Sequence, residues 1–444
     1  MSKRRPNTTG SLFGGLTPPR STLGFLLGSC VLLLSGYALS TTPAFALEVP
    51  IALAMCGPLL LVLLHRGAPT IDLREPRYWV WFALTVGTLL SAFFDRGGSP
   101  LNSALGLSAF ITCALLLTIA VPWQSFLSAF IRAMDWIAAI GVAATVAIVY
   151  GGLRLPLSTV VNDNQVAYLN GYLFFLVDLG EGILPRALGV FWEPGLFASF
   201  LVVAVLAELC LVERRANRWR LALYAVAVLL TQSTAGYILL LFTCFVAFFS
   251  RRGRGTDLAF LGSLIVGLLS SYSIDRIIAV LAASQPDVFG KISDGGFLSE
   301  TRWNSLLVNW DLFSQSPLVG MGLGGASESF SASMDTMLRA QTSTSGFFIA
   351  AIGVSGVLYT GAWVLGVLRQ TSVPPYARVW MLVCVLVIVN KEPHTTILFS
   401  YCFLFYLLAD RPPRPAGPVV ATLSEGRLKH HESMPITGST GGGA

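Results

Sequence analysis

Two charged side chains, Arg186 and Glu193, stand seven residues apart in the segment RALGVFWEPGLFASF, where a long apolar run begins. A lone cation in an apolar setting is costly, so it is normally paired with an acid or used to bind a ligand. An arginine near helix ends suits phosphate or pyrophosphate, because its fork of donors matches their oxygens. The glutamate is a candidate acid–base group or partner of the arginine. It is also well placed to begin a helix, with Pro194 in the first turn, so a purely structural role stays open.

Four further residues in hydrophilic connections could take part in the same chemistry. Arg302 begins TRWNSLLVNWDLFSQ, Arg339 precedes AQTSTSG, and Lys391 and His394 lie in NKEPHTT. The three cations could bind an anion, and the histidine is a second candidate for a base. Each also has a plainer interpretation, because Arg302 and Arg339 could contact lipid headgroups or water, and NKEPHTT is a polar end that must face water anyway.

Two glycine- and serine-containing segments could contact a ligand without charge. GMGLGG (320–325) matches GxGxxG, but no expected strand precedes it, so a dinucleotide site is not indicated. Its glycines permit a tight turn, and backbone N–H groups at Gly320, Gly322 and Gly324 could meet a phosphate or a sugar. In TQSTAGY (231–237), Ser233 and Tyr237 either line a sugar pocket or satisfy helix ends.

Composition places these residues in a membrane protein. The chain has 444 residues, of which 54% are hydrophobic and only 12% are charged, whereas soluble proteins carry about 25% charged residues. Apolar runs near 20 residues recur along the chain, long enough to cross about 30 Å of hydrocarbon. The seven cysteines lie in apolar runs without CxxC spacing, so neither a zinc site nor a disulfide framework is indicated.

The pattern predicts an all-α, polytopic inner-membrane protein with about 12 transmembrane helices and both termini in the cytoplasm. The expected spans are 21–41, 48–65, 78–94, 101–121, 133–151, 194–212, 219–233, 235–250, 258–274, 344–368, 376–390 and 396–409. With this orientation, 21 of the 29 Lys and Arg residues lie inside, as the positive-inside rule requires. The net charge of +6 therefore reflects topology, and nucleic acid is not an expected partner. Cleavage after Ala44-Phe45-Ala46 would leave the later sidedness unchanged.

The expected organisation is a cytoplasmic segment (1–20), a transmembrane domain (21–410) and a disordered cytoplasmic tail (411–444) that is rich in Pro, Gly and Ser. Two outer connections, at about 152–193 and 275–343, are long and are expected to be ordered. Within the second, residues at helical spacing predict an amphipathic helix over 299–315 near the outer surface. Its apolar residues are Trp303, Leu306, Leu307, Trp310 and Phe313.

Three segments in this order resemble signatures of the bacterial O-antigen polymerase and ligase superfamily, which includes the Wzy-type polysaccharide polymerases. They are RALGVFWEPGLFASF (186–200), LLTQSTAGYILLLF (229–242) and TRWNSLLVNWDLFSQSPLVGMGLGG (301–325). The family pattern is an arginine and Glu-Pro before a helix, a Thr-x-Ser turn between helices, and an arginine followed by Pro-Leu-x-Gly-x-Gly in the largest outer loop.

The resemblance implies a GT-C-type membrane glycosyltransferase that needs no metal or other cofactor. Its substrate would be an oligosaccharide carried on undecaprenyl pyrophosphate at the periplasmic face, and a chain-length regulator and a flippase would be possible partners. Arg186, Arg302, Arg339 and Lys391 would then bind pyrophosphate or sugar, and Glu193 or His394 would act as the base. The product would be O-antigen, capsule or exopolysaccharide.

Two alternatives stay open. A ligase would transfer the glycan onto lipid A core, but that branch usually has a His-Asn pair before the helix after the large loop. Here AQTSTSG (340–346) contains neither residue, which favours the polymerase. A transporter or lipid-linked-sugar flippase is the non-enzyme alternative, although no internal repeat or midplane charge indicates it.

Overall fold

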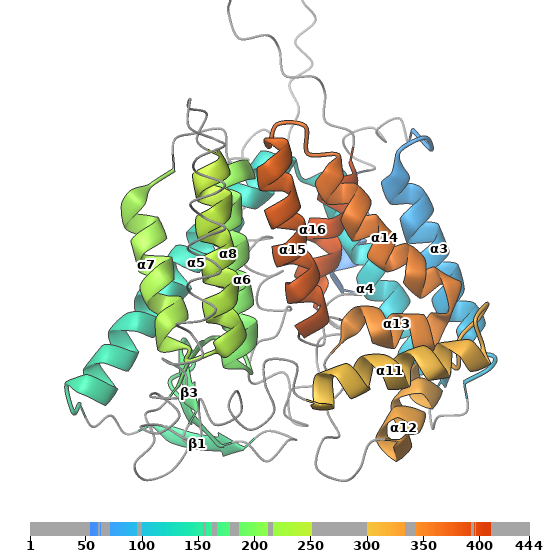
Figure 1. Cartoon of the computed structure of the whole chain (residues 1–444), viewed down its shortest axis with the longest axis horizontal. Helices are drawn as coiled ribbons and strands as arrows, with labels where there is room; N and C mark the ends of the chain where they lie inside the picture. Colours follow the sequence, from blue (N-terminus) through green and yellow to red (C-terminus); the bar gives the residue numbers. More distant parts are fainter. Residues whose placement is uncertain are drawn as a thin grey trace, which may run out of the picture. The chain divides into compact units, whose positions relative to one another are not determined.

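The computed structural model describes residues 54–60, 63, 72–95, 100–153, 157–161, 167–177, 186–211, 216–250, 300–333, 343–391, 395 and 397–409. These residues are mostly helical and belong to one compact unit that ends at Leu408 (Figure 1). The helices are α3 (Pro76–Ser91), α4 (Pro100–Ala120), α5 (Trp123–Thr145), α6 (Pro194–Leu206), α7 (Arg218–Leu230), α8 (Thr234–Ser250), α11 (Glu300–Gln315), α12 (Leu323–Ser333), α13 (Thr344–Ile352), α14 (Val354–Leu368), α15 (Pro375–Lys391) and α16 (Leu398–Leu408).

Three helical stretches in the described part of the chain are long and apolar enough to cross a membrane. They are Pro100–Ala120, Trp123–Val149 and Pro194–Leu211. The second and third are lengthened by the π-helical turns η3 (Val146–Tyr150) and η4 (Ala207–Leu211). These stretches support a membrane protein. The count of about 12 spans stays a prediction, because the expected spans 21–41 and 258–274, like the segments 1–20 and 411–444, lie outside the described residues.

Two expected spans differ from the helices observed. α5 begins at Trp123, ten residues before the expected start at 133, because the connection after Pro122 is itself apolar and helix-compatible. The expected span 344–368 is two helices, α13 and α14, separated at Gly353. Gly353 has φ of +59° and packs against the backbone of Pro317 and Leu318. A side chain at this position would be strained and would collide, so the glycine sets the break.

The expectation of an all-α fold misses a sheet in the connection 152–193. The four strands β1 (Ser158–Val161), β2 (Ala167–Asn170), β3 (Phe175–Val177) and β4 (Arg186–Gly189) form an antiparallel sheet in the order β1-β2-β3-β4. Three- and four-residue strands give little alternation to read from a sequence, and turn geometry sets their register. Gly171 and Tyr172 turn the chain between β2 and β3, with Tyr172 at φ of +59° and its N–H donating to Asn170 Oδ1 (2.8 Å). β4 packs on α5 and α6 and leads directly into α6.

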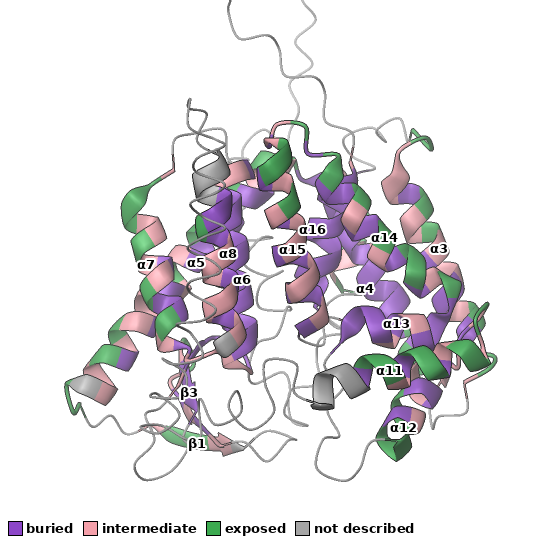
Figure 2. Ribbon diagram, viewed as in Figure 1, coloured by how far each residue is buried: buried purple, intermediate pink, exposed green. Residues whose placement is uncertain are grey.

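The core lies where α5, α6 and α16 meet, and it is rich in aromatic rings. Phe399 of α16 contacts Phe126 and Phe130 of α5 and Phe200 of α6, at centroid separations of 5.8, 4.5 and 5.0 Å. α6 and α16 are buried along their lengths, whereas α3 and α7 expose residues along one side (Figure 2). The two buried helices therefore form a rigid centre, and the ends of their neighbours carry the polar groups described next.

Candidate functional site

Two of the residues singled out in the sequence are bonded to each other in the structure. Lys391, the last residue of α15, donates from Nζ to Oγ of Ser233, 3.0 Å away, in the turn between α7 and α8. The lysine is only 7% exposed. Lysine is almost never buried unless it has a partner. Lys391 is thus held where two helix ends meet, by a serine that is 158 positions away in the chain.

The turn that holds Ser233 is ordered by its own side chains. The hydroxyl of Thr231 donates to the carbonyl of Val228 (2.7 Å), and Gln232 takes a positive φ of +50°. The N–H of Gly236 donates to Ser233 Oγ (3.3 Å), so Ser233 also satisfies the start of α8. The serine oxygen therefore accepts from both a backbone N–H and the lysine ammonium, and its position is fixed from two directions.

A second pair of polar groups joins α15 to the start of α13. Ser343 Oγ donates to Asn390 Oδ1 (2.9 Å) and accepts from the N–H of Gly346 (3.0 Å), which makes Ser343 the N-cap of α13. Asn390 also donates from Nδ2 to the carbonyl of Leu386 (2.9 Å). We call Ser233, Ser343, Asn390 and Lys391 the helix-end cluster, since it ties the end of α15 to the starts of α8 and α13.

Glu193 begins a helix at the same end of the bundle. It is the N-cap residue of α6, with Pro194 in the first turn, and its side chain makes no cap hydrogen bond. The prediction that Glu193 begins the helix with Pro194 in its first turn is therefore confirmed for the backbone. A capping role of the Glu193 side chain is not observed. α6 and α8 begin side by side, because Gly236 in the first turn of α8 lies against Ala198 of α6. The carboxylate and the helix-end cluster thus belong to neighbouring helix starts.

Arg186 is the first residue of β4 and is half buried, opposite Val177 of β3. A hydrogen bond fixes the segment after β4 to the sheet: the hydroxyl of Tyr168 in β2 donates to the carbonyl of Trp192 (2.8 Å). Gly189, with φ of +59°, lies close to Ile137 and Phe197. The sheet therefore carries the arginine and fixes the chain that enters α6.

The glycines of GMGLGG have a packing role in the structure. The N–H groups of Gly320 and Gly322 donate to Ser316 and Ala351 carbonyls, and that of Gly324 donates to Asp95 Oδ2 (2.8 Å). Gly320 and Gly322 have φ of +79° and +84°. Added Cβ atoms would collide with Ala351 and with Asp95 respectively. The expectation that these N–H groups are free to meet a ligand is therefore not supported, and Asp95 is the anion at the start of α12.

The remaining candidates divide in two. Tyr237 donates its hydroxyl to the carbonyl of Leu229 (3.0 Å), closing the α7–α8 turn. Arg339, His394 and the side chain of Arg302 lie outside the described residues, so their predicted roles stay predictions. Among the residues that the structure describes, no three His, Cys, Asp or Glu side chains gather as metal ligands.

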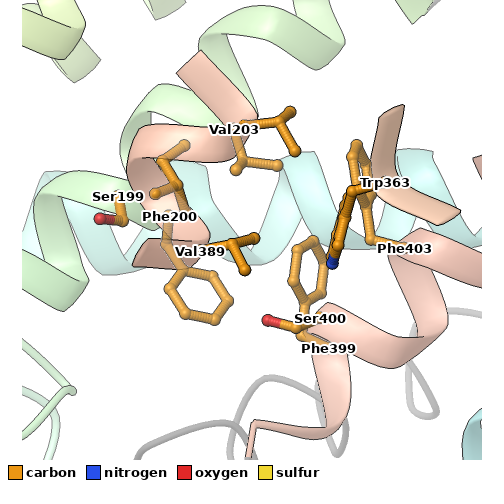
Figure 3. A pocket seen from close by; sticks show the side chains of 10 residues that line it. Ser199, Phe200, Val203, Trp363, Val389, Phe399, Ser400 and Phe403 are labelled. Carbon is orange, nitrogen blue, oxygen red and sulfur yellow. The ribbon is translucent and has the colours of Figure 1, made fainter. Parts of the chain in front are cut away.

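Beside the helix-end cluster, an apolar pocket opens between α6, α14, α15 and α16 (Figure 3). Its α15 wall ends at Val389, two positions before Lys391. The lining consists of aliphatic and aromatic side chains. Its polar groups are the hydroxyls of Ser199 and Ser400 and the indole N–H of Trp363. The lining residues are Ser199, Phe200, Val203, Trp363, Val385, Ile388, Val389, Phe399, Ser400 and Phe403. This surface suits an apolar group rather than a sugar.

The sequence analysis missed a charged cluster within the helices. Arg220 of α7 donates from Nε to Asp135 of α5 (2.7 Å) and from Nη1 to Glu208 of η4 (3.1 Å). Tyr224 places its hydroxyl 2.6 Å from Asp135 Oδ1, and the Glu208 side chain is 0% exposed. We call Asp135, Glu208, Arg220 and Tyr224 the carboxylate cluster. The signal was present, since charges inside apolar runs are rare and normally partnered.

Comparison of the chain with protein-family models, with curated proteins and with solved structures gives no match.

Proposed function

We propose that this chain is a polysaccharide polymerase of the bacterial inner membrane, with about 12 spans and a catalytic face on the periplasmic side. It would transfer a growing glycan from undecaprenyl pyrophosphate onto a lipid-linked repeat unit. The observation that carries the proposal is the bond between Lys391 Nζ and Ser233 Oγ. It joins the Thr-x-Ser turn of the resemblance to a buried cation, next to the helix that begins at the Glu-Pro of the resemblance.

The chemistry needs a fixed positive charge. As the acceptor hydroxyl oxygen bonds to the anomeric carbon, the bond from that carbon to the pyrophosphate oxygen breaks and the pyrophosphate leaves with the electron pair. A preorganised cation stabilises the charge that develops on this leaving group. Lys391 would supply it, oriented by Ser233, and Arg186, Arg302 and Arg339 are the further cations that we assign to pyrophosphate and sugar. The proton of the acceptor hydroxyl would pass to Glu193 or His394.

The surroundings of the cluster suit a substrate with a charged head and an apolar carrier. The pocket of Figure 3 presents hydrocarbon along the last two turns of α15, the helix that ends at Lys391. Asn390 and Ser343 add neutral oxygen and nitrogen atoms on the other side of the lysine's helix end. Pyrophosphate would then meet the cation, while part of the lipid carrier meets the apolar wall.

The test uses purified full-length protein and lipid-pyrophosphate-linked oligosaccharides extracted from a deletion strain. Lys391→Met should reduce the rate of glycan elongation by roughly 10²–10³-fold, the usual loss when one stabilising group is removed. Arg378→Gln is the matched control, because Arg378 lies at the opposite end of α15 and donates to the carbonyl of Leu368 (2.8 Å). It should elongate normally.

Three results would contradict the proposal. Normal elongation by correctly folded Lys391→Met would remove the role of the cation. Transfer only when lipid A core is supplied would instead identify a ligase. Movement of the lipid-linked oligosaccharide across vesicles without elongation would identify a flippase.

A further inference from the structure

Helix α11 presents a polar face to the protein interior. Ser305 and Asn309 are 2% and 1% exposed, and Leu312 one turn later is also buried. α11 packs against α13, where Asn309 lies next to Gly346 in the first turn. The inward side of this helix therefore carries a hydroxyl and an amide group next to Leu312, whereas the buried side of a helix on a soluble protein is mainly apolar.

The outward side of α11 has two sectors of different polarity. Leu306, Leu307 and Trp310 form an apolar sector, with Trp310 62% exposed. Asp311 and Gln315 form a polar sector, and they are joined by a hydrogen bond from Gln315 Nε2 to Asp311 Oδ2 (3.1 Å). At 100° per residue these sectors lie on adjacent arcs of the helix. The helix thus has one side packed on protein, one exposed apolar side and one exposed polar side.

The apolar sector continues into a surface that suits lipid. Leu318, just beyond α11, is 76% exposed and its backbone packs on Gly353, where α14 begins. From there the exposed residues of α14, which include Val354 and Leu358, extend the apolar surface along an apolar helix. α11 lies across the direction of α6, α8 and α15, with exposed residues on its outward side (Figures 1 and 2). This orientation, across apolar helices that run in another direction, is the one expected of a helix that lies on a membrane surface.

We propose that α11 docks on the outer leaflet of the bilayer. Trp310, Leu306 and Leu307 lie at the boundary between headgroups and acyl chains, while Asp311 and Gln315 face water. The proposal rests on the chain being a membrane protein, and it holds whether or not the chain polymerises glycans. Docking keeps the Ser305–Asn309 face against α13, whose cap Ser343 bonds to Asn390 beside Lys391. The bilayer thereby helps to hold one side of the helix-end cluster.

The test measures tryptophan fluorescence of the full chain in vesicles of phosphatidylcholine and phosphatidylglycerol, with phosphatidylcholine brominated at shallow or deep acyl positions. The contribution of Trp310 is the difference between wild type and Trp310→Phe. We expect this contribution to be quenched by bromine, and more strongly at shallow than at deep positions. Trp79, 63% exposed on α3, and Trp363, 3% exposed, provide the exposed and the buried comparison through their own Phe variants.

Two results would overturn the proposal. A Trp310 contribution that no brominated lipid quenches would show that water or protein covers this face. A contribution whose quenching vanishes as the protein-to-lipid ratio rises would show that a second copy of the chain covers it. Should Trp310→Phe fail to fold, Leu306→Trp provides the same measurement as a gained, shallowly quenched contribution. Elongation measured on the same samples tests the proposed activity separately.

Discussion

The ammonium of Lys391 at the end of α15 donates to the neutral hydroxyl of Ser233, whereas the guanidinium of Arg220 in the first turn of α7 lies between two carboxylates. The hydroxyl that accepts from Lys391 is neutral, and it orients the ammonium. Asp135 and Glu208 orient theirs and also cancel its charge. Both cations are largely buried, so burial does not separate the two sites.

The partners of the two cations therefore indicate different roles. A guanidinium bonded by two carboxylates and surrounded by three helical segments, α5, η4 and α7, is a structural joint. In the proposed function, the ammonium that Ser233 orients is the cation that an anionic substrate meets. The comparison predicts that changes in the carboxylate cluster alter stability, and that changes in the helix-end cluster alter activity per folded molecule.

The largest expected effect comes from Arg220→Met. It leaves Asp135 and the fully buried Glu208 without the cation that binds both, which costs about 3–5 kcal/mol in the free energy of unfolding. Equilibrium unfolding in mixed micelles, together with the yield of folded protein, measures it. Arg220→Lys should give a smaller loss of stability than Arg220→Met, because lysine keeps the positive charge but lacks the planar fork that bonds to Asp135 through Nε and to Glu208 through Nη1.

A triple variant sharpens this prediction. Arg220→Met combined with Asp135→Asn and Glu208→Gln should recover much of the lost free energy of unfolding. The reason is that the single variant leaves two negative carboxylates without their cation, and the triple variant makes both side chains neutral. If Arg220→Met alone were as stable as wild type, the carboxylate cluster would not be a joint.

Tyr224→Phe should have a smaller effect of the same kind. It removes a hydroxyl that donates to Asp135 Oδ1 at 2.6 Å and lies 3.1 Å from the carbonyl of Ile131. Hydrogen bonds to a charged group contribute about 1.5–3 kcal/mol, and Arg220 still binds the carboxylate in this variant. The free energy of unfolding should therefore drop within that range, while elongation per folded molecule stays at the wild-type rate. A selective loss of elongation would instead place Tyr224 in the catalytic machinery.

Much of the helical fold could be predicted from apolar runs, because length and hydropathy alone define such helices. α4 and α8 begin and end within one residue of expectation, and α6 together with η4 ends one residue before the expected end. α3 begins two residues and ends three residues before its expected bounds. The sheet and the break at Gly353 were not predicted. Both depend on backbone geometry and on contacts between distant segments, and no local periodicity encodes these.

The candidate site was predictable only in part. Ser233 and Lys391 were singled out, but their contact depends on how α8 packs against α15. Asn390 was overlooked because an amide at the end of an apolar run carries no charge signal. Asp135 was overlooked because α5 was expected to start ten residues later than it does, which puts Asp135 near the expected helix start. With the correct start, Asp135 falls inside the helix and needs a partner.

The smallest effect, and the sharpest test of the comparison, is expected for Ser233→Ala. The alanine removes the acceptor that orients Lys391 and also the acceptor for the N–H of Gly236. Losing the cap should lower the free energy of unfolding by about 1 kcal/mol. Losing the orientation of the ammonium should slow elongation about tenfold, equivalent to about 1.4 kcal/mol in transition-state stabilisation.

Ser233→Thr separates these two losses, because threonine keeps a hydroxyl that can both cap α8 and accept from Lys391. It should restore elongation to within a few-fold of wild type. Ser91→Ala is the matched control, since the buried Ser91 hydroxyl donates within α3 to the carbonyl of Thr88 (2.9 Å) rather than to a group of the helix-end cluster or the pocket. If Ser233→Ala lost only stability and elongated at the wild-type rate per folded molecule, the helix-end cluster would be a joint like the carboxylate cluster. Lys391 would then not be required to bind the substrate or to stabilise its leaving group.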